Sequence, residues 1–224
     1  MLDLVTGELI SSCSSEFLIA GVDEVGRGAW AGPISVGVAC ARKQEILDLL
    51  ASDRDLRRVN DSKLLSPNAR LGALNVITQY FRTSVGSASS AECDQLGLTS
   101  ALRIASERAF EGIGLRADLV LLDGKFNYLA SPNVANVVKG DTKSVVIAAA
   151  SVVAKLARDA YMNEIDESYP YWNFSSNKGY PSPAHRRALA IVGLSSIHRL
   201  TWRYVDSMNL SVGNFGTNGL RLDV

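Results

Sequence analysis

Cysteine is scarce in this chain, and its spacing suggests no pairing. The 3 cysteines (Cys13, Cys40 and Cys93) are odd in number, and no two of them form a Cys-x-x-Cys motif. This pattern argues against a disulfide framework or a zinc site and fits a reducing cytoplasm. Long apolar runs are missing too: no window approaches the ~20 residues of a membrane span, and the N-terminus lacks the regions of a signal peptide. We expect a soluble, cytoplasmic protein without a membrane partner.

An excess of charge of one sign is also missing. The sequence has 23 Lys and Arg against 23 Asp and Glu, so its net charge gives no indication of a nucleic-acid partner. Acidic residues are absent, however, between Glu167 and Asp206, where both histidines lie. This stretch could face a polyanion, or it could be a solvated helical face, and the pattern leaves both possibilities open. Its basic residues are Lys178, Arg186, Arg187, Arg199 and Arg203.

The order of the predicted elements indicates an α/β protein. A short connection between the first two strands favours an antiparallel pair, and the later helix–strand order favours a mixed sheet flanked by helices. Ser66 before Pro67 is a typical helix start. Strands are predicted at residues 17–22, 33–41, 82–88, 118–122 and 134–138, and helices at 44–50, 66–80, 99–110 and 146–167, with a further helix start near 90.

The length of 224 residues suits one well-buried domain with a small appendage. We assign residues 1–166 to a core that carries the candidate site. Residues 167–209 form a C-terminal helical extension packed on that core. The Gly- and Asn-rich residues 210–224 form a flexible tail.

Two adjacent acidic residues end the first predicted strand. Asp23 and Glu24 stand where a buried segment reaches the surface, a costly place for two negative charges unless a cation shares them. The turn Gly26-Arg27-Gly28 follows at once and offers backbone N–H groups and a guanidinium suited to a phosphate or a sugar. Acids beside such a turn suggest phosphodiester chemistry.

Asp123 and Asp141 repeat this arrangement further along the chain. Each follows an apolar strand and adjoins a glycine, and ligand sites in open α/β sheets gather at such strand ends. If the strands are neighbours, both residues could converge with Asp23 and Glu24 on Mg²⁺ or Mn²⁺, which prefer oxygen ligands. Two such ions about 3.5–4 Å apart would activate a water and stabilise the leaving oxygen of a phosphodiester.

Simpler interpretations exist for each acid. An aspartate beside a glycine is commonly a turn residue, which would account for Asp123 and Asp141 separately. Neighbours within a regular strand point to opposite faces. Glu24 can therefore join Asp23 only if it lies beyond the regular part of the strand.

With these residues, the chain resembles the bacterial ribonuclease HII family over about residues 17–204. Residues 21–33 (GVDEVGRGAWAGP) are similar to the family's opening signature, and residues 61–63 to its DSK segment. Asp123 and Asp141, in their glycine contexts, match the family's third and fourth acids. Further similar segments are the helix ending at Asp159, the KGYP segment at 178–181 and the pair His198-Arg199.

The resemblance implies a ribonuclease H-like fold and endonucleolytic cleavage of the RNA strand in RNA–DNA hybrids. It also implies incision 5′ of single ribonucleotides embedded in duplex DNA, with 5′-phosphate and 3′-hydroxyl products. By the family's pattern, Asp23, Glu24, Asp123 and Asp141 are catalytic and bind two divalent ions, Mg²⁺ or Mn²⁺. The partner is then an RNA–DNA hybrid or a ribonucleotide-containing duplex. No apolar stripe suggests more than a monomer.

The same resemblance assigns the substrate contacts. The turn Gly26-Arg27-Gly28 would read the ribose 2′-OH through backbone groups, and Tyr180 would stack on the deoxyribose just beyond the scissile bond. This division is physically reasonable, because the 2′-OH alone distinguishes RNA from DNA at one position. Lys63 and Arg27 are suited to gripping phosphates.

Other residues receive no catalytic role from the sequence. Asp159 could orient a metal ligand or simply take part in helix ion pairs. His185 and His198 are interpreted as surface or capping residues. Trp30 departs from the Pro-Leu that often follows the turn in the family, so we expect the packing of this loop to differ.

Three alternative functions are open at this point. A different two-metal nuclease or recombinase of the same fold would cleave DNA without ribonucleotides. A catalytically silent hybrid-binding protein would bind without cutting, although all four acids are present. A small-molecule phosphatase would have no use for the DSK and KGYP segments.

Overall fold

The computed structural model describes residues 13–52, 59, 65–129 and 131–210. Within them a five-stranded sheet has the order β3-β2-β1-β4-β5. Strands β1, β2 and β3 are antiparallel neighbours, whereas β4 and β5 run parallel to β1. The predicted mixed sheet is therefore confirmed. The strands are β1 (Leu18–Val25), β2 (Ile34–Arg42), β3 (Arg82–Ala88), β4 (Leu119–Asp123) and β5 (Val134–Val137).

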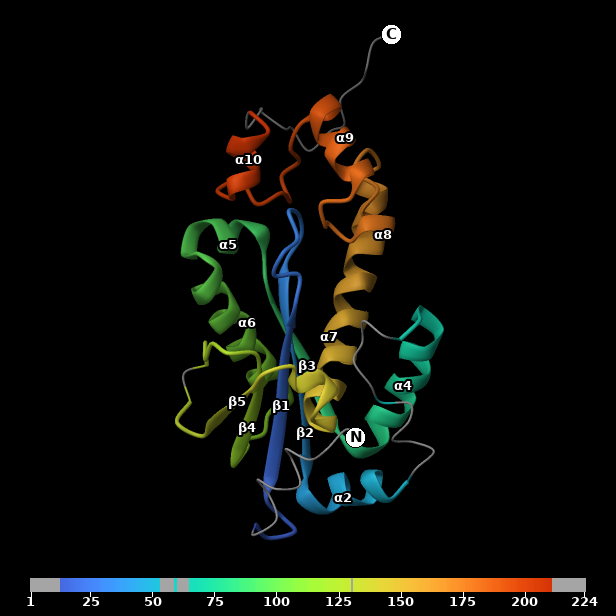
Figure 1. The fold of residues 1–224 in the computed structure, drawn as a ribbon, viewed down its shortest axis with the longest axis vertical. Coiled ribbons are helices and arrows are strands. Elements are labelled where there is room, and N and C mark those ends of the chain that lie inside the picture. Colours follow the sequence, from blue (N-terminus) through green and yellow to red (C-terminus); the bar gives the residue numbers. More distant parts are fainter. Residues whose placement is uncertain (1–12, 53–58, 60–64, 130, 211–224) are drawn as a thin grey trace.

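Helices cover both faces of the sheet, as Figure 1 shows. On one face α7 (Val145–Glu164) packs along β1 and β2, and on the other α6 (Leu98–Ile113) packs against β2 and β3. The helix predicted after Ser66 is α4 (Pro67–Tyr80), and the Ser66 side chain caps it by accepting from the Ala69 N–H. The other helices are α2 (Lys43–Ala51), α5 (Ser90–Leu96), α8 (Phe174–Asn177), α9 (Pro183–Val192) and α10 (Arg203–Ser207), with 3-10 turns η1 (Gly140–Thr142) and η2 (Ile165–Ser168).

Alternation along the strands produces an apolar core on each face. Leu121 belongs to the core beneath α7, whereas Val22 belongs to the core beneath α6. Because successive strand residues point to opposite faces, this alternation also assigns the acids that follow. Asp23 and Asp123 continue on the α7 side, and Glu24 continues on the α6 side.

Glycines allow α7 to approach the sheet closely. A Cβ at Gly21 would lie 2.1 Å from the Val146 carbonyl oxygen, and one at Gly37 would lie 2.4 Å from the Ala150 carbonyl oxygen. The alanines of α7 at 148–150 are fully buried against these strands. The interface between β1 and α7 therefore has no room for a side chain at Gly21.

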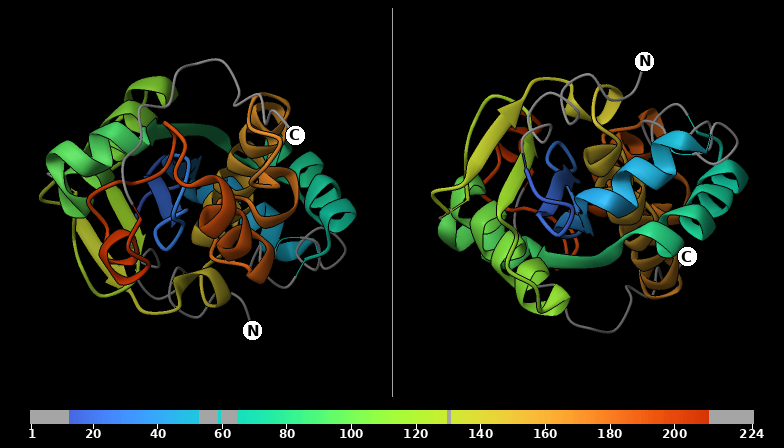
Figure 2. Two further views of the ribbon diagram at one scale, coloured as in Figure 1. Left: turned by 90° about the horizontal axis from the view of Figure 1, so that it is seen from above. Right: turned by 90° about the horizontal axis from the view of Figure 1, so that it is seen from below.

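The C-terminal segment lies over the end of the β1–β2 hairpin. Seen from above in Figure 2, α8, α9 and α10 gather around the blue hairpin turn. They enclose a third apolar cluster that includes Ala31, Met162, Trp172 and Phe174. Among the residues that the structure describes, no helix combines the length and apolar character needed to cross a membrane.

We predict that Gly21→Ala destabilises the protein, because the added methyl group must displace the α7 backbone. Overpacking of this kind costs about 1–3 kcal/mol. Gly72→Ala is the matched control: a Cβ at Gly72 meets nothing within 4 Å, and alanine is favoured in a helix interior by up to ~1 kcal/mol. Urea unfolding measures both variants. A Gly21→Ala protein as stable as wild type would contradict the close packing.

Candidate active site

The first strand is longer than the sequence predicts. β1 continues through Val25, and Glu24 pairs with Val36 of β2 inside the regular ladder. The condition for Glu24 to join Asp23 on one face, a place beyond the regular strand, is therefore not met, because pairing with β2 extends the ladder past the acids. Asp23 and Glu24 leave β1 on opposite faces. The Glu24 N–H nevertheless donates to Asp23 Oδ1 at 2.8 Å.

The structure places Asp23 and Asp123 at the carboxyl ends of β1 and β4, and it brings the residue before Asp141 against Asp123. Asp23 and Asp123 lie on neighbouring parallel strands, one residue past the last pair of their ladder. Asp123 Oδ1 accepts from the Gly140 N–H at 2.6 Å, so the residue before Asp141 touches it directly. Asp23 is 5% exposed and Asp141 is 6% exposed. These carboxylates are thus largely withdrawn from water at one edge of the sheet.

Glu24 lies on the α6 side, where Tyr128 and Arg27 contact it. The Tyr128 hydroxyl donates to Glu24 Oε2 at 3.3 Å, and Arg27 Nη1 lies 3.2 Å from Glu24 Oε1. Burial raises the pKa of Tyr128 well above its usual value, and the charges of Glu24, Asp23 and Asp123 raise it further. The charges of these three acids therefore all act on the Tyr128 hydroxyl. Sequence reasoning missed Tyr128, because no pattern marks a tyrosine in the loop after β4.

The donor types at this edge fit hard divalent cations. All four acids supply carboxylate oxygens, which suit Mg²⁺ or Mn²⁺, and buried carboxylates that share a location are stabilised by a cation. Among residues 13–52, 59, 65–129 and 131–210, no group of three or more His, Cys, Asp or Glu side chains is arranged so that it could hold a metal ion. The chemistry of the residues agrees with the predicted ions, while their arrangement here is not that of a closed metal site.

The glycine-rich turn meets Tyr180 at the end of β1. The Gly26 N–H donates to the Tyr180 hydroxyl at 3.1 Å across a sequence separation of 154 residues. Gly26 has φ of 86°, and a Cβ there would lie 2.3 Å from Arg158 Nε, so glycine is required. Arg27 and Gly28 are exposed, and space beside Gly28 is open to 4 Å. The turn therefore presents accessible backbone next to a half-buried aromatic ring.

Arg158 of α7 supports this turn from beneath. It is 1% exposed, and its guanidinium donates to the carbonyls of Pro33, Lys178 and Ala31 at 2.9, 2.9 and 3.2 Å. The same group lies 5.3 Å from the centroid of the Tyr180 ring. One buried cation thus joins the hairpin turn to the segment that carries Tyr180.

Arg199 is a second buried guanidinium under the turn. It is fully buried and donates to the Gly32 carbonyl at 3.2 and 3.3 Å and to the Arg27 carbonyl at 3.3 Å. Burial lowers its pKa to about 10. The two interpretations of the basic stretch, a face toward a polyanion or a solvated face, are both wrong for Arg199.

Other predicted residues have mixed outcomes. Lys63 lies outside the described residues, so its predicted phosphate contact stays a prediction. Asp159 Oδ1 accepts from Lys155 at 2.7 Å, and its Oδ2 lies 3.8 Å from Arg70 of α4. These contacts favour the ion-pair interpretation of Asp159.

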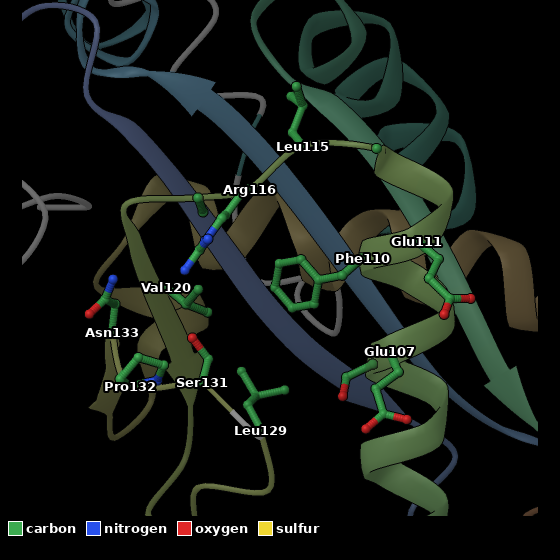
Figure 3. Close-up of a pocket in the computed structure, with 13 residues that line it drawn as sticks. Glu107, Phe110, Glu111, Leu115, Arg116, Val120, Leu129, Ser131, Pro132 and Asn133 are labelled. Atoms are coloured by element: carbon green, nitrogen blue, oxygen red, sulfur yellow. The ribbon is translucent and has the colours of Figure 1, made fainter.

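A cavity of about 610 Å³ lies elsewhere, between α6 and the start of β4 (Figure 3). Phe110, Val120 and Leu129 are among the residues that line it, together with Glu107 and Glu111. None of the four acids at the carboxyl ends of the strands is among its lining residues. The candidate site is therefore the open edge of the sheet and not this cavity.

Solved structures of similar fold define the class of protein. The ribonuclease H2 from Pyrococcus horikoshii OT3 superposes with a TM-score of 0.70 over 86% of this chain and 97% of that chain, at 24% identity. A ribonuclease HIII, Bst-RNase HIII in complex with Mn²⁺, superposes with a TM-score of 0.63 over 90% of this chain and 72% of that chain, at 17% identity. The chain therefore shares the fold of these ribonucleases H.

Sequence comparison gives the family. The family model described as ribonuclease HII matches residues 20–205. A ribonuclease HII from Streptomyces avermitilis is 45% identical over 193 residues, which cover 85% of this chain and 79% of that protein. The chain belongs to the ribonuclease HII family. It is a ribonuclease H, a hydrolase of the endonuclease class.

We predict that Arg158→Lys destabilises the protein by about 2 kcal/mol. A lysine ammonium cannot reproduce the planar fork that serves three carbonyls, and each buried polar group left unsatisfied costs about 1–3 kcal/mol. Arg187→Lys, at an exposed position of α9, is the control and is expected to have little effect. Chemical denaturation measures both. Equal stability of the two variants would show that the guanidinium does not hold the turn.

Proposed function

We propose that the protein cleaves the RNA strand of RNA–DNA hybrids and incises 5′ of single ribonucleotides in duplex DNA. Its products would carry 5′-phosphate and 3′-hydroxyl ends. The observation that supports this best is the 3.1 Å contact between the Gly26 N–H and the Tyr180 hydroxyl, at the end of the strand that carries Asp23 and Glu24. An open turn, an aromatic ring and carboxylates side by side suit a substrate that is read at one sugar and cut at the adjacent phosphate.

Recognition of the substrate is divided between the turn and Tyr180 in this proposal. The backbone of Gly26, Arg27 and Gly28 contacts the ribose 2′-OH, and Tyr180 stacks on the deoxyribose that follows. The Arg27 side chain, which is 50% exposed, and Lys63 bind phosphates, which position the duplex without reading its sequence.

The four acids, Asp23, Glu24, Asp123 and Asp141, would hold two divalent ions, Mg²⁺ or Mn²⁺. Bound ions of this kind supply the activation of a water and the neutralisation of the leaving 3′-oxygen. The Mn²⁺ complex of a ribonuclease HIII with the same fold supports this choice. The chain itself orients the ligands, since the Gly140 N–H holds Asp123 and the Tyr128 hydroxyl holds Glu24.

The wider assignment follows from the same proposal. Residues 1–166 would form the catalytic core and 167–209 its helical extension, acting as a monomer on a hybrid or ribonucleotide-containing duplex. The predicted tail lies outside the described residues from 211 onward. We place the activity in the cytoplasm, where thiols stay reduced; the thiols of Cys40 and Cys93 are both buried and free.

We predict that Asp23→Asn abolishes incision of a duplex with one embedded ribonucleotide while leaving binding largely intact. Loss of one carboxylate ligand removes several kcal/mol of transition-state stabilisation, a fall of about 10³-fold in rate. Gel analysis of the end-labelled duplex with Mg²⁺ or Mn²⁺ measures cutting, and fluorescence anisotropy measures binding.

Asp48→Asn is the matched control for this experiment, because Asp48 lies on α2, where its carboxylate accepts from Gln44 Nε2 at 2.9 Å. It is expected to cut like wild type. Retained turnover in Asp23→Asn would overturn the assignment of the acids. Binding without cutting by the wild-type protein would support the silent hybrid-binding alternative instead.

We predict that Arg27→Ala weakens binding of all duplexes alike. The slope of log K against log[salt], which is negative, is expected to become shallower by about 0.9, the contribution of one phosphate contact. The measurement uses the Asp23→Asn background, so that no substrate is consumed. Arg116→Ala, at an exposed position beside the separate cavity, is expected to leave the slope unchanged. An unchanged slope in Arg27→Ala would exclude a phosphate contact at this side chain.

A further inference from the structure

Two histidines lie buried behind the segment that carries Tyr180. His185 is the third residue of α9, and His198 lies in the following loop, where it forms an isolated bridge with Ala31 of the hairpin turn. They are 0% and 1% exposed. The rings of Trp172 and Phe174 contact them at centroid distances of 5.5–5.7 Å. The surface interpretation of these histidines is therefore wrong.

Their hydrogen bonds form a continuous chain. His198 Nδ1 lies 2.8 Å from the Ser195 backbone nitrogen, and its Nε2 lies 3.0 Å from His185 Nε2. His185 Nδ1 lies 2.9 Å from the Tyr180 carbonyl oxygen. The Ser195 loop is thereby connected, through two imidazoles, to the backbone of Tyr180.

The two ends of the chain determine the position of every proton. The Ser195 N–H can only donate, and the Ser195 hydroxyl, 2.7 Å from the same nitrogen, is able to donate as well. His198 Nδ1 therefore accepts, and the His198 proton is on Nε2. That proton is donated to His185 Nε2, which leaves the His185 proton on Nδ1. The Tyr180 carbonyl can only accept, and it faces this Nδ1–H. With both imidazoles neutral and in these tautomers, all four ring nitrogens have a hydrogen-bond partner.

An additional proton fits this chain poorly. It would place two N–H groups face to face between the rings, or it would set a His198 Nδ1–H against the Ser195 N–H, with only the Ser195 Oγ, 2.7 Å away, to accept it. Burial accordingly lowers the pKa of both rings, that of His198 to about 3, with the neighbouring His185 lowering it further. The Tyr180 carbonyl opposes this lowering of the His185 pKa, and the charge of Arg186 adds to it.

Tyr180 is held at three separate points as a result. Its carbonyl accepts from His185, its ring lies under the guanidinium of Arg158, and its hydroxyl accepts from the Gly26 N–H. The Tyr180 carbonyl also accepts from the Ser182 N–H at 2.7 Å, so two donors, one from the start of α9 and one from the His185 ring, hold the backbone from which the ring projects. Without a donor at His185, the carbonyl would keep Ser182 alone and would be held from one direction only.

We propose that His185 and His198 are positioning residues that hold Tyr180 against the Gly26 turn and thereby sharpen discrimination at the RNA–DNA junction. This inference rests on the proposed function of Tyr180 as the reader of the deoxyribose. The histidines themselves do not touch the substrate. They transmit the position of the C-terminal loop to the side chain that reads the deoxyribose, Tyr180.

The first test needs no substrate. Nitrogen-15 NMR of the imidazoles of the wild-type protein at pH 7 is expected to show the Nδ1–H tautomer for His185 and the Nε2–H tautomer for His198. In His185→Leu, hydrogen exchange of the Gly26 amide is expected to accelerate about tenfold, the effect of losing one hydrogen bond in the series. The opposite tautomers, or an unchanged Gly26 amide in the variant, would overturn the proposal.

The second test measures function with a matched pair of variants. His185→Asn retains a donor near the Nδ1 position, whereas His185→Leu retains bulk without a donor. We expect the ratio of kcat/KM for an embedded ribonucleotide over a continuous RNA strand to fall about tenfold in His185→Leu and to recover in His185→Asn. In a Tyr180→Ala background the same change is expected to have no further effect. Equal ratios in the pair, or additive losses in that background, would contradict the positioning role.

These outcomes separate this inference from the proposed function. If the wild-type protein shows no discrimination while the tautomers and Gly26 exchange behave as expected, the proposed function fails and the positioning of Tyr180 stands. If discrimination is present but independent of His185, the positioning role fails alone.

Discussion

The guanidinium of Arg158, enclosed by three backbone carbonyls, holds together the parts on which the proposed chemistry depends. It sits at the end of α7 nearest the β1–β2 hairpin and contacts the turn through Ala31 and Pro33 and the Tyr180 segment through Lys178. A charge buried in this way is costly unless all its donors are satisfied. Because the donors of Arg158 need these carbonyls, the hairpin turn and the segment that carries Tyr180 are held in fixed positions relative to each other. Arg199 is a second buried guanidinium that contacts the turn, through the carbonyls of Arg27 and Gly32.

Strand β1 connects this turn to the acids. It is the central strand of the sheet, and it delivers Asp23 and Glu24 only a few residues before the turn that would read the sugar. Its parallel partner β4 delivers Asp123 to the same edge. The close approach of α7 at Gly21 keeps the strand, the helix and Arg158 in fixed relation. The proposed reading of the sugar and cutting of the strand would thus both depend on one rigid strand, with loops added at its end.

Much of this arrangement could be predicted from sequence, because the signals are local. Alternating apolar residues indicated the strands, and Ser66 with Pro67 indicated the start of α4. The short hairpin connection indicated the antiparallel pair. The acids were conspicuous because each follows an apolar run, and the Gly26–Gly28 turn because glycine and arginine adjoin them.

What could not be predicted depends on partners remote in the chain. The face from which Glu24 projects depends on how far β2 extends the ladder. Arg199 can be buried because backbone carbonyls of the turn accept its hydrogen bonds. An acidic partner would be visible in the sequence, whereas a backbone carbonyl is present at every residue. The roles of His185 and His198 depend on one amide and one carbonyl brought to them by the fold. Tyr128 is identified only by its contact with Glu24.

The claim that the turn reads a single 2′-hydroxyl beside the cutting acids is tested most directly by changing that group alone. Three otherwise identical duplexes would carry ribose, 2′-fluoro-deoxyribose or deoxyribose at one position, and initial rates would be compared with Mg²⁺ present. Our account predicts incision 5′ of the ribose and rates lower by several orders of magnitude for the other two. Comparable cutting of all three duplexes would contradict it.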